Sequence, residues 1–403
     1  MGDISCTDPA NLSLIECLEQ QPACNQRKNS SNVSLLSASF ARIGIDGVPS
    51  PTAPVAVPGT QELPRSSLVA ANAEMVHTLE GHTGGVRTMS VSPDGKTLYS
   101  SGEDRSIRIW SMGPLGCSLL HVIRDAHPGW VWSLLVDPSG EILYSGSGDR
   151  TIRMWSLGEQ SSPPSLRHVV SGHTESVCSL VSSKDGAFLY SGSDDRTIRV
   201  WDSSAGVSTP LVPLQILTGH TGYVSALCLS PDNTVLFSSG MNGDNSIKLW
   251  QVCGTLPSKA TSRGSHAPPV CKLLTSLTAQ TGIYTIALSL DGKVMYSGGE
   301  DRSIMLWSID ATTGTGLLLR SHEHAHDHWV RSLRLTPNGR ILISGSADMN
   351  IGLWEVNLEG TDIRLLKQLN GHTDRVRCVR VSPDGDQFFS GSSDMTIRCW
   401  KLK

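Results

Sequence analysis

The sequence predicts an all-β fold made of seven tandem copies of one unit, and three observations point to it. The segment 100–110, SSGEDRSIRIW, occurs in seven variants that all end in tryptophan. These tryptophans are separated by 45, 46, 49, 57, 47 and 46 residues. Each copy also contains a tight turn of the type SPDG, as at 92–95. The seven closing residues are Trp110, Trp155, Trp201, Trp250, Trp307, Trp354 and Trp400.

Each unit is predicted to be a short succession of strands and turns. Most copies open with a Gly-His pair such as Gly81-His82, and an apolar strand such as VRTMSVS at 86–92 follows. In the SPDG turn, proline presets φ, aspartate bonds its own backbone and glycine accepts a positive φ. A strand such as TLYSSG at 97–102, a turn centred on Asp and a strand ending in Trp come next. Short strands joined by such turns predict an antiparallel meander.

These motifs resemble the WD-repeat β-propeller family, and the resemblance covers about residues 75–403. It implies an all-β, seven-bladed β-propeller in which each blade is a four-stranded antiparallel sheet and the blades are arranged radially. The dipeptide that names the family occurs once, at Trp201-Asp202, whereas Ser, Gln, Glu or Lys follows the tryptophan in the other copies. The second letter of the motif is therefore a loose feature of this chain.

Residues 1–74 have a different composition, rich in Ser, Asn, Pro and Ala. The segment VPSPTAPVAVPGTQELP at 48–64 is typical of a low-complexity linker. We expect a mostly disordered N-terminal extension. A short partner-binding helix at 9–21, with Leu12, Ile15 and Leu18 on one face, is the alternative interpretation.

A serine and an aspartate recur before each closing tryptophan. The Asp stands six residues before the Trp in every copy. The family resemblance suggests that His, Ser, Asp and Trp form one hydrogen-bonded tetrad per blade, which would satisfy a buried indole N–H and a buried carboxylate together. The predicted tetrads are His82-Ser100-Asp104-Trp110, His127-Ser145-Asp149-Trp155, His173-Ser191-Asp195-Trp201, His220-Ser238-Asp244-Trp250, His326-Ser344-Asp348-Trp354 and His372-Ser390-Asp394-Trp400. We expect these residues to be structural.

The fourth and fifth copies depart from the pattern. The fifth has Ala279 or Gln280 where the histidine belongs, which predicts an incomplete tetrad around Ser297, Asp301 and Trp307. The fourth carries two extra residues in its Asp turn, and an insertion at 251–273 separates the two copies. We therefore expect blades four and five to be the least regular part of the ring.

The two ends of the repeat region predict how the ring closes. An unpaired strand, EMVHTLEGH at 74–82, precedes the first copy, and the last copy finishes with the strand TIRCWKLK at 396–403. Docking residues 75–79 beside residues 396–402 would complete the last blade and leave no open sheet edge.

Composition and charge exclude several classes of function. The net charge of -4 and the 17% of charged residues give no electrostatic reason to expect nucleic acid or an anionic membrane as a partner. The sequence has no run of about 18 apolar residues and no basic, apolar start typical of a signal peptide. The ten cysteines form no Cys-x-x-Cys pair. We expect a cytoplasmic protein, with the nucleus as the alternative.

The motifs of catalysis and cofactor binding are missing from the sequence. There is no phosphate-binding glycine loop and no Ser-His-Asp set in a strand–turn–helix context. The segment SHEHAHDHW brings His322, His324, His326 and His328 together with the alternate spacing of metal ligands, but His326 aligns with the tetrad histidines. We expect no metal, no cofactor and no enzymatic activity.

The candidate binding site lies where the first strand of each copy begins, a region here called the top rim. Exposed Trp and Arg are favoured interface anchors, and Arg suits carboxylate or phosphate groups. The alternative is that the tryptophans pack between blades and the arginines are solvated. The rim residues are Arg87, Trp130, Trp132, Tyr223, Trp329, Arg331, Arg375 and Arg377, with the four arginines expected on one arc of the ring.

The function predicted from these features is that of a non-catalytic scaffold or adaptor for protein–protein interactions in a multiprotein complex. A reader of an acidic or modified peptide through the Arg/Trp rim is the second hypothesis. A substrate receptor of a ubiquitin ligase is a further alternative, although no F-box and no Trp-Asp-x-Arg box occur. We expect protein or peptide partners and no small-molecule substrate. An enzyme is the least favoured class, because fold alone does not supply chemistry.

Overall fold

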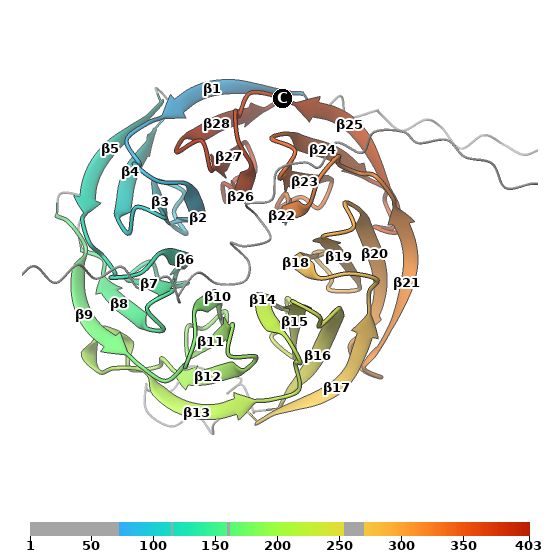
Figure 1. Ribbon diagram of the computed structural model, residues 1–403, viewed down its shortest axis with the longest axis horizontal. Coiled ribbons are helices and arrows are strands. Elements are labelled where there is room, and N and C mark those ends of the chain that lie inside the picture. The colour runs from blue at the N-terminus through green and yellow to red at the C-terminus, as the bar shows by residue number, and fades with distance from the viewer. Residues whose placement is uncertain (1–71, 114–115, 159–161, 254–269) are drawn as a thin grey trace, which may run out of the picture. The chain divides into compact units, whose positions relative to one another are not determined.

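The computed structural model describes residues 72–113, 116–158, 162–253 and 270–403. These residues form seven four-stranded antiparallel sheets arranged around one axis (Figure 1). The predicted fold class, a seven-bladed β-propeller, is confirmed. The predicted N-terminal extension falls outside the described residues, apart from its last three positions.

The first four blades use their strands in chain order from the axis outward. Blade one consists of β2 (Val86–Val91), β3 (Thr97–Gly102), β4 (Ile107–Gly113) and β5 (Gly116–Ile123). Blade two consists of β6 (Val131–Val136), β7 (Ile142–Ser147), β8 (Ile152–Ser156) and β9 (Ser165–Val170). Blade three consists of β10 (Val177–Ser182), β11 (Phe188–Ser193), β12 (Ile198–Asp202) and β13 (Val212–Leu217), with the 3-10 turn η2 (Gly206–Ser208) before its outer strand. Blade four consists of β14 (Tyr223–Leu229), β15 (Val235–Met241), β16 (Ser246–Cys253) and β17 (Val270–Thr278).

The remaining blades follow the same plan, except that the last one borrows a strand. Blade five consists of β18 (Ile283–Leu288), β19 (Val294–Gly299), β20 (Ile304–Asp310) and β21 (Thr315–His322). Blade six consists of β22 (Val330–Leu335), β23 (Ile341–Ser346), β24 (Ile351–Val356) and β25 (Ile363–Leu369). Blade seven consists of β26 (Val376–Val381), β27 (Gln387–Ser392), β28 (Ile397–Leu402) and β1 (Ala73–Leu79).

Strand β1 closes the ring by pairing antiparallel with β28, so the first and last strands share one sheet (Figure 1). The register runs from Ala73 opposite Leu402 to Leu79 opposite Ile397. The closure predicted from the two ends of the repeat region is thus confirmed, and β1 begins two residues earlier than expected. The pairing covers the edge of β28, which would otherwise be open to another chain, and makes β1 the outer strand of blade seven.

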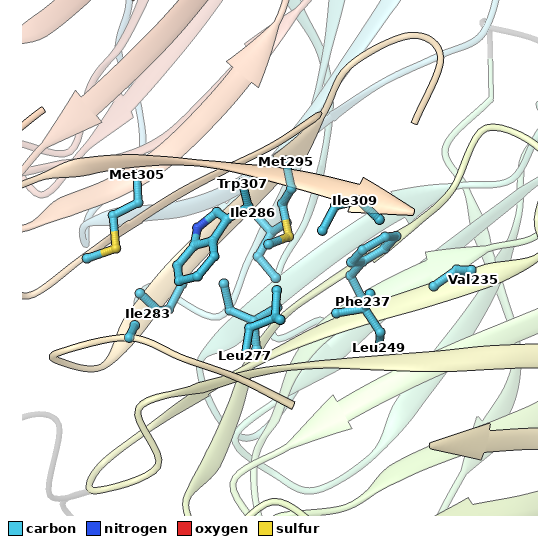
Figure 2. Packing of buried hydrophobic residues seen from close by; sticks show 12 residues of the cluster. Val235, Phe237, Leu249, Leu277, Ile283, Ile286, Met295, Met305, Trp307 and Ile309 are labelled. Carbon is cyan, nitrogen blue, oxygen red and sulfur yellow. The ribbon is translucent and has the colours of Figure 1, made fainter. Parts of the chain in front are cut away.

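The hydrophobic core lies between neighbouring blades. One cluster joins Phe237 and Leu249 of blade four to Ile286, Met295 and Trp307 of blade five (Figure 2). Such clusters form because the middle strands bury both faces, as in β7, where every residue is buried. The Ser-Gly pair in these strands permits the close approach of the next blade. A Cβ at Gly146 would lie 2.8 Å from Val177 Cγ1, closer than real Cβ contacts allow.

The turns adopt the conformations that their residues predict. In the SPDG turns the fourth residue has a positive φ, 71° at Gly95 and 60° at Asn233, which replaces glycine in blade four. The extra residues of the Asp turn in blade four include Asn242 and Gly243, which have φ of 56° and 89°. Blades four and five both keep four strands. Most of the insertion between them, 254–269, falls outside the described residues.

Candidate functional site

The tetrads are buried hydrogen-bonded groups between the strands of each blade. In blade one, His82 Nδ1 lies 2.7 Å from Asp104 Oδ2, and His82 Nε2 lies 2.8 Å from Ser100 Oγ. Trp110 Nε1 donates to the same Oγ at 2.8 Å. Because a carboxylate only accepts, Nδ1 donates to Asp104 and Nε2 accepts from the serine hydroxyl. The four side chains therefore satisfy one another.

The charge states in the tetrads follow from burial and from these bonds. Burial lowers the pKa of His82, although the hydrogen bond to Asp104 opposes this effect. Burial raises the pKa of Asp104, but hydrogen bonds from His82 and Ser106 outweigh it and bring the pKa to about 2. A neutral imidazole beside a carboxylate is the arrangement that results at pH 7.

Six blades contain the complete group. The His–Asp distances run from 2.6 to 2.8 Å, and the same histidines lie 2.7 to 2.8 Å from the serines. The histidines are His82, His127, His173, His220, His326 and His372, all buried. Their polar atoms point into the blades, so the tetrads offer no surface to a ligand.

Blade five keeps only part of the tetrad. Trp307 Nε1 donates to Ser297 Oγ at 2.8 Å. Ala279 stands in the place of the histidine, four residues before the buried Ile283, just as His82 stands four residues before Val86. Asp301 Oδ1 accepts from the backbone N–H of Ser303, whose buried hydroxyl has no hydrogen-bond partner. This matches the incomplete tetrad expected from the sequence.

A β-bulge at the second residue of the inner strands sets the geometry of the top rim. The register of β2, β6, β18, β22 and β26 shifts between the first and third residues. A bulge re-aims the side chain of the extra residue. The residues at this position are Arg87, Trp132, Tyr284, Arg331 and Arg377, and Cys178 occupies it in β10, which has the same shift.

The first rim group is an arginine held against two tryptophans from the next blade. Arg87 Cζ lies 4.8 Å from the ring centroid of Trp130 and 4.3 Å from that of Trp132. Its Nε donates to Glu103 Oε1 at 3.0 Å, and only 9% of the residue is exposed. The structure therefore places Arg87 in a charge-compensated stack between blades, where it positions the indoles, rather than on an exposed arc.

The second rim group also stacks an arginine on two aromatic rings, here across blades five and six. Arg331 Cζ lies 4.1 Å from the ring centroid of Tyr284 and 4.9 Å from that of Trp329. The two aromatic rings are 5.7 Å apart. Sequence reasoning missed Tyr284, although it occupies the same strand position as Arg87 and Trp132. Aligning the second residues of the inner strands would have found it.

Positive charge gathers around this second group. Burial lowers the pKa of His328, and the guanidinium groups of Arg375, Arg331 and Arg302 lower it further. The His328 ring packs at 4.9 Å against Trp329. In blade seven, Arg377 Nε donates to Ser393 Oγ at 2.6 Å. Three of the four predicted rim arginines thus belong to the adjacent blades six and seven.

The other sequence candidates are distributed differently. Tyr223 begins β14 and belongs to neither rim group, and burial together with the carboxylate of Asp194 raises its pKa. The histidines of SHEHAHDHW separate: His326 is in a tetrad, His328 is in the rim, and His322 Nε2 lies 3.0 Å from Asp362 Oδ1. Within the described residues, no group of three or more His, Cys, Asp or Glu side chains is arranged to hold a metal.

A family model described as "WD domain, G-beta repeat" matches the chain in seven segments, one for each blade. The chain belongs to the WD-repeat family. The matched segments are 73–111, 117–156, 164–202, 211–251, 271–308, 317–355 and 363–401. WD-repeat propellers typically serve as protein-interaction scaffolds and are generally non-catalytic.

Curated relatives of this WD-repeat chain are similar over part of its length. "Nuclear distribution protein PAC1" of Arthroderma otae is 28% identical over 162 residues, which is 38% of this chain and 33% of the relative. "Nuclear distribution protein PAC1-2" of Uncinocarpus reesii is 31% identical over 131 residues, 31% of this chain and 27% of the relative. "Small ribosomal subunit protein RACK1" of Neurospora crassa is 34% identical over 95 residues, 23% of this chain and 24% of the relative. The alignments thus span about a quarter to a third of these relatives.

In the described part of the chain, no helix has the length and apolar character needed to cross a membrane.

Proposed function

We propose that this WD-repeat protein is a non-catalytic scaffold that binds protein partners through its top rim. The observation that carries the proposal is the pair of arginine–aromatic groups at the bulges of the inner strands. Tryptophan, tyrosine and arginine are the residues that most often dominate binding energy in protein interfaces. Both groups are held rigidly by stacking, so ordering them on binding costs little conformational entropy.

The two halves of the rim differ in composition, and this difference supports a more specific version. On blades one and two, Glu103 compensates Arg87, and the half-buried indoles of Trp130 and Trp132 supply flat apolar surface. On blades five to seven, the positive charges of Arg375, Arg331 and Arg302 act on His328 and lower its pKa. A peptide that carries carboxylate or phosphate groups at one end and an apolar side chain at the other complements this surface.

The experiment is a binding measurement on peptide arrays with matched acidic, phosphorylated and neutral sequences. Arg331→Ala combined with Arg377→Ala should weaken binding of acidic or phosphorylated peptides by about tenfold or more, which corresponds to about 1.4 kcal/mol. The control is Arg167→Ala combined with Arg340→Ala, which removes the same charge from two exposed sites on β9 and in the turn before β23. Equal binding by both double variants would refute the role of the rim.

A third variant separates the scaffold from the peptide reader. Trp132→Ala removes apolar surface without changing the net charge. If the partner is recognised mainly by its acidic groups, Trp132→Ala should bind within about twofold of the wild type. If the aromatic half anchors a neutral partner, it should bind at least about tenfold more weakly. Proximity labelling in cells, with the Arg331/Arg377 variant as the reference, would then identify the partner.

We further propose a cytoplasmic location, with the nucleus as the alternative. The cysteines in the described residues are free thiols, some of them buried, as is usual in a reducing compartment. Imaging of a tagged chain tests this location, and a secreted or luminal signal would contradict it.

A further inference from the structure

The inner strands carry a charge pattern that the top rim does not account for. The seven strands around the axis, β2, β6, β10, β14, β18, β22 and β26, contain no aspartate and no glutamate (Figure 1). They contain five arginines, and four of these lie on the adjacent strands β22 and β26. Two belong to the rim already described. The other two, Arg334 and Arg380, occupy the same position three residues further along each strand.

Arg334 and Arg380 are brought together by the packing of blades six and seven. The backbone N–H of Val379 donates to Ser332 Oγ at 3.1 Å, which fixes the relative register of β22 and β26. The electrostatic influence of Arg334 reaches the thiol of Cys228 on β14, two blades away. Both arginines are only half-buried and lie on the strands next to the axis of the ring.

Each of these guanidinium groups is held in place by one short hydrogen bond. Arg334 Nη1 donates to Leu333 O at 2.7 Å, and Arg380 Nη1 donates to Val379 O at 2.8 Å. These are the hydrogen bonds that the two side chains make, and neither side chain has an ion-pair partner in the described residues. A guanidinium has five N–H donors in a planar fork. Most of the donors of this pair therefore remain available to a ligand.

The pair is electrostatically uncompensated. Burial lowers the pKa of Arg334. Burial and the neighbouring positive charge of Arg334 lower the pKa of Arg380 to about 9, which leaves Arg380 charged at pH 7. Two half-buried cations of like sign, with no carboxylate on any inner strand, are stabilised by a bound anion.

We propose that Arg334 and Arg380 form an anion site on the axis of the ring that takes a phosphate group. Phosphate fits better than a halide or a single carboxylate because it presents several acceptor oxygens and two charges to two planar forks. The phosphate group has two possible sources: a small phosphorylated molecule, or a phosphorylated residue of a peptide bound at the rim. The site is distinct from the rim, because Arg331 and Arg377 interact at the bulges, three residues earlier in each strand.

The test is a calorimetric titration of the full chain with pyrophosphate at constant ionic strength. The wild type should bind one pyrophosphate per chain, and its unfolding temperature should rise with pyrophosphate concentration. Arg334→Gln combined with Arg380→Gln should weaken binding by about tenfold or more. Arg167→Gln combined with Arg340→Gln, which removes the same charge from exposed sites, should bind as the wild type does.

The proposal is overturned if the wild type shows neither binding nor a shift in unfolding temperature, or if both double variants bind equally well. Circular dichroism and gel filtration establish that each variant is folded. If the glutamine pair does not fold, Arg334→Lys and Arg380→Lys keep the charge but lose the planar fork. Each should then weaken binding by about threefold or more, and unchanged affinity in both overturns the proposal.

Two further measurements distinguish the sources of the phosphate. If it belongs to a free small molecule, Arg331→Ala with Arg377→Ala leaves pyrophosphate affinity unchanged while peptide binding is lost. If the phosphate belongs to a peptide, pyrophosphate competes with that peptide, and the double variant Arg334→Gln/Arg380→Gln weakens the binding of both ligands. Either result supports the anion site. Failure of the rim proposal alone leaves the pyrophosphate titration unaffected, so the two proposals fail separately.

Discussion

Replacing one tetrad serine tests whether the polar groups in the blades depend on one another. In blade three, Ser191 is fully buried. Its hydroxyl accepts from Trp201 Nε1 at 2.8 Å and lies 2.7 Å from His173 Nε2, to which it donates. Ser191→Ala removes both bonds with little change in volume. Each buried group left unsatisfied costs about 1–3 kcal/mol, so we expect a loss of about 2–6 kcal/mol in the free energy of unfolding.

Blade five supplies the matched control. Ser297 is buried to the same degree and accepts from Trp307 Nε1 at 2.8 Å, but no histidine adjoins it. Ser297→Ala therefore leaves one buried group, the Trp307 indole N–H, without a partner instead of two. The expected loss in the free energy of unfolding is about 1–3 kcal/mol. The difference between the two variants isolates the contribution of the histidine bond, because both substitutions remove the same hydroxyl from the same strand position.

The assay is urea unfolding at pH 7, followed by tryptophan fluorescence and by circular dichroism. Coincident transitions justify a two-state free energy, and otherwise the midpoints are compared at equal slope. Ser191→Ala should unfold at a clearly lower urea concentration than Ser297→Ala. Equal midpoints would refute the reasoning, because they would mean that the His173 bond adds nothing to a tetrad that already contains the Trp–Ser bond.

Three further outcomes follow from the structure. Hydrogen bonds hold the pKa of Asp104 near 2 despite burial, and burial lowers the pKa of His82. In acid, the folded protein therefore binds fewer protons at these two groups than the unfolded chain does. Stability should be full above about pH 6.5 and fall steadily on acidification toward pH 2, and acid stabilisation in thermal scans would contradict this. Deleting residues 73–79 exposes the edge of β28, so gel filtration should show larger species, whereas an unchanged monomer would argue against the closure mechanism. Met395 has a φ of 67° and is 46% exposed. Because asparagine tolerates this left-handed conformation better than methionine, Met395→Asn should raise the free energy of unfolding by about 0.5–1 kcal/mol. A lower melting temperature of the variant would contradict backbone strain at this position.

The features that the sequence predicted correctly are those determined by residues close together within each repeat. The turn residues fix the meander, as Gly95 and Asn233 show with their positive φ. The spacing between Ser100 and Trp110 places the two side chains on paired strands, because Leu98 lies opposite Trp110 and Ser100 opposite Arg108. Ring closure was predictable because the repeat region begins with an unpaired strand and ends with a blade that lacks its fourth strand, so the two can complete one sheet.

The rim was predicted less completely because its contacts join different blades. Arg87 looked like an exposed cation, yet Glu103, sixteen residues later, neutralises it, and both indoles it touches come from blade two. Tyr284 was missed for the same reason, since its partner Arg331 belongs to the next blade. Pairings of this kind depend on how neighbouring inner strands align, and that alignment is a property of the assembled ring rather than of any single copy.

The shared last blade gives the protein a particular order of assembly during synthesis. Among the strands that the structure describes, β1 leaves the ribosome first and its partner β28 leaves last. Until then, the hydrogen-bonding edge of β1 has no neighbour, and its side chains Met75 and Val76 are apolar. A nascent chain with six finished blades therefore still carries one strand whose partner has not been made, and unpaired strand edges of this kind promote aggregation.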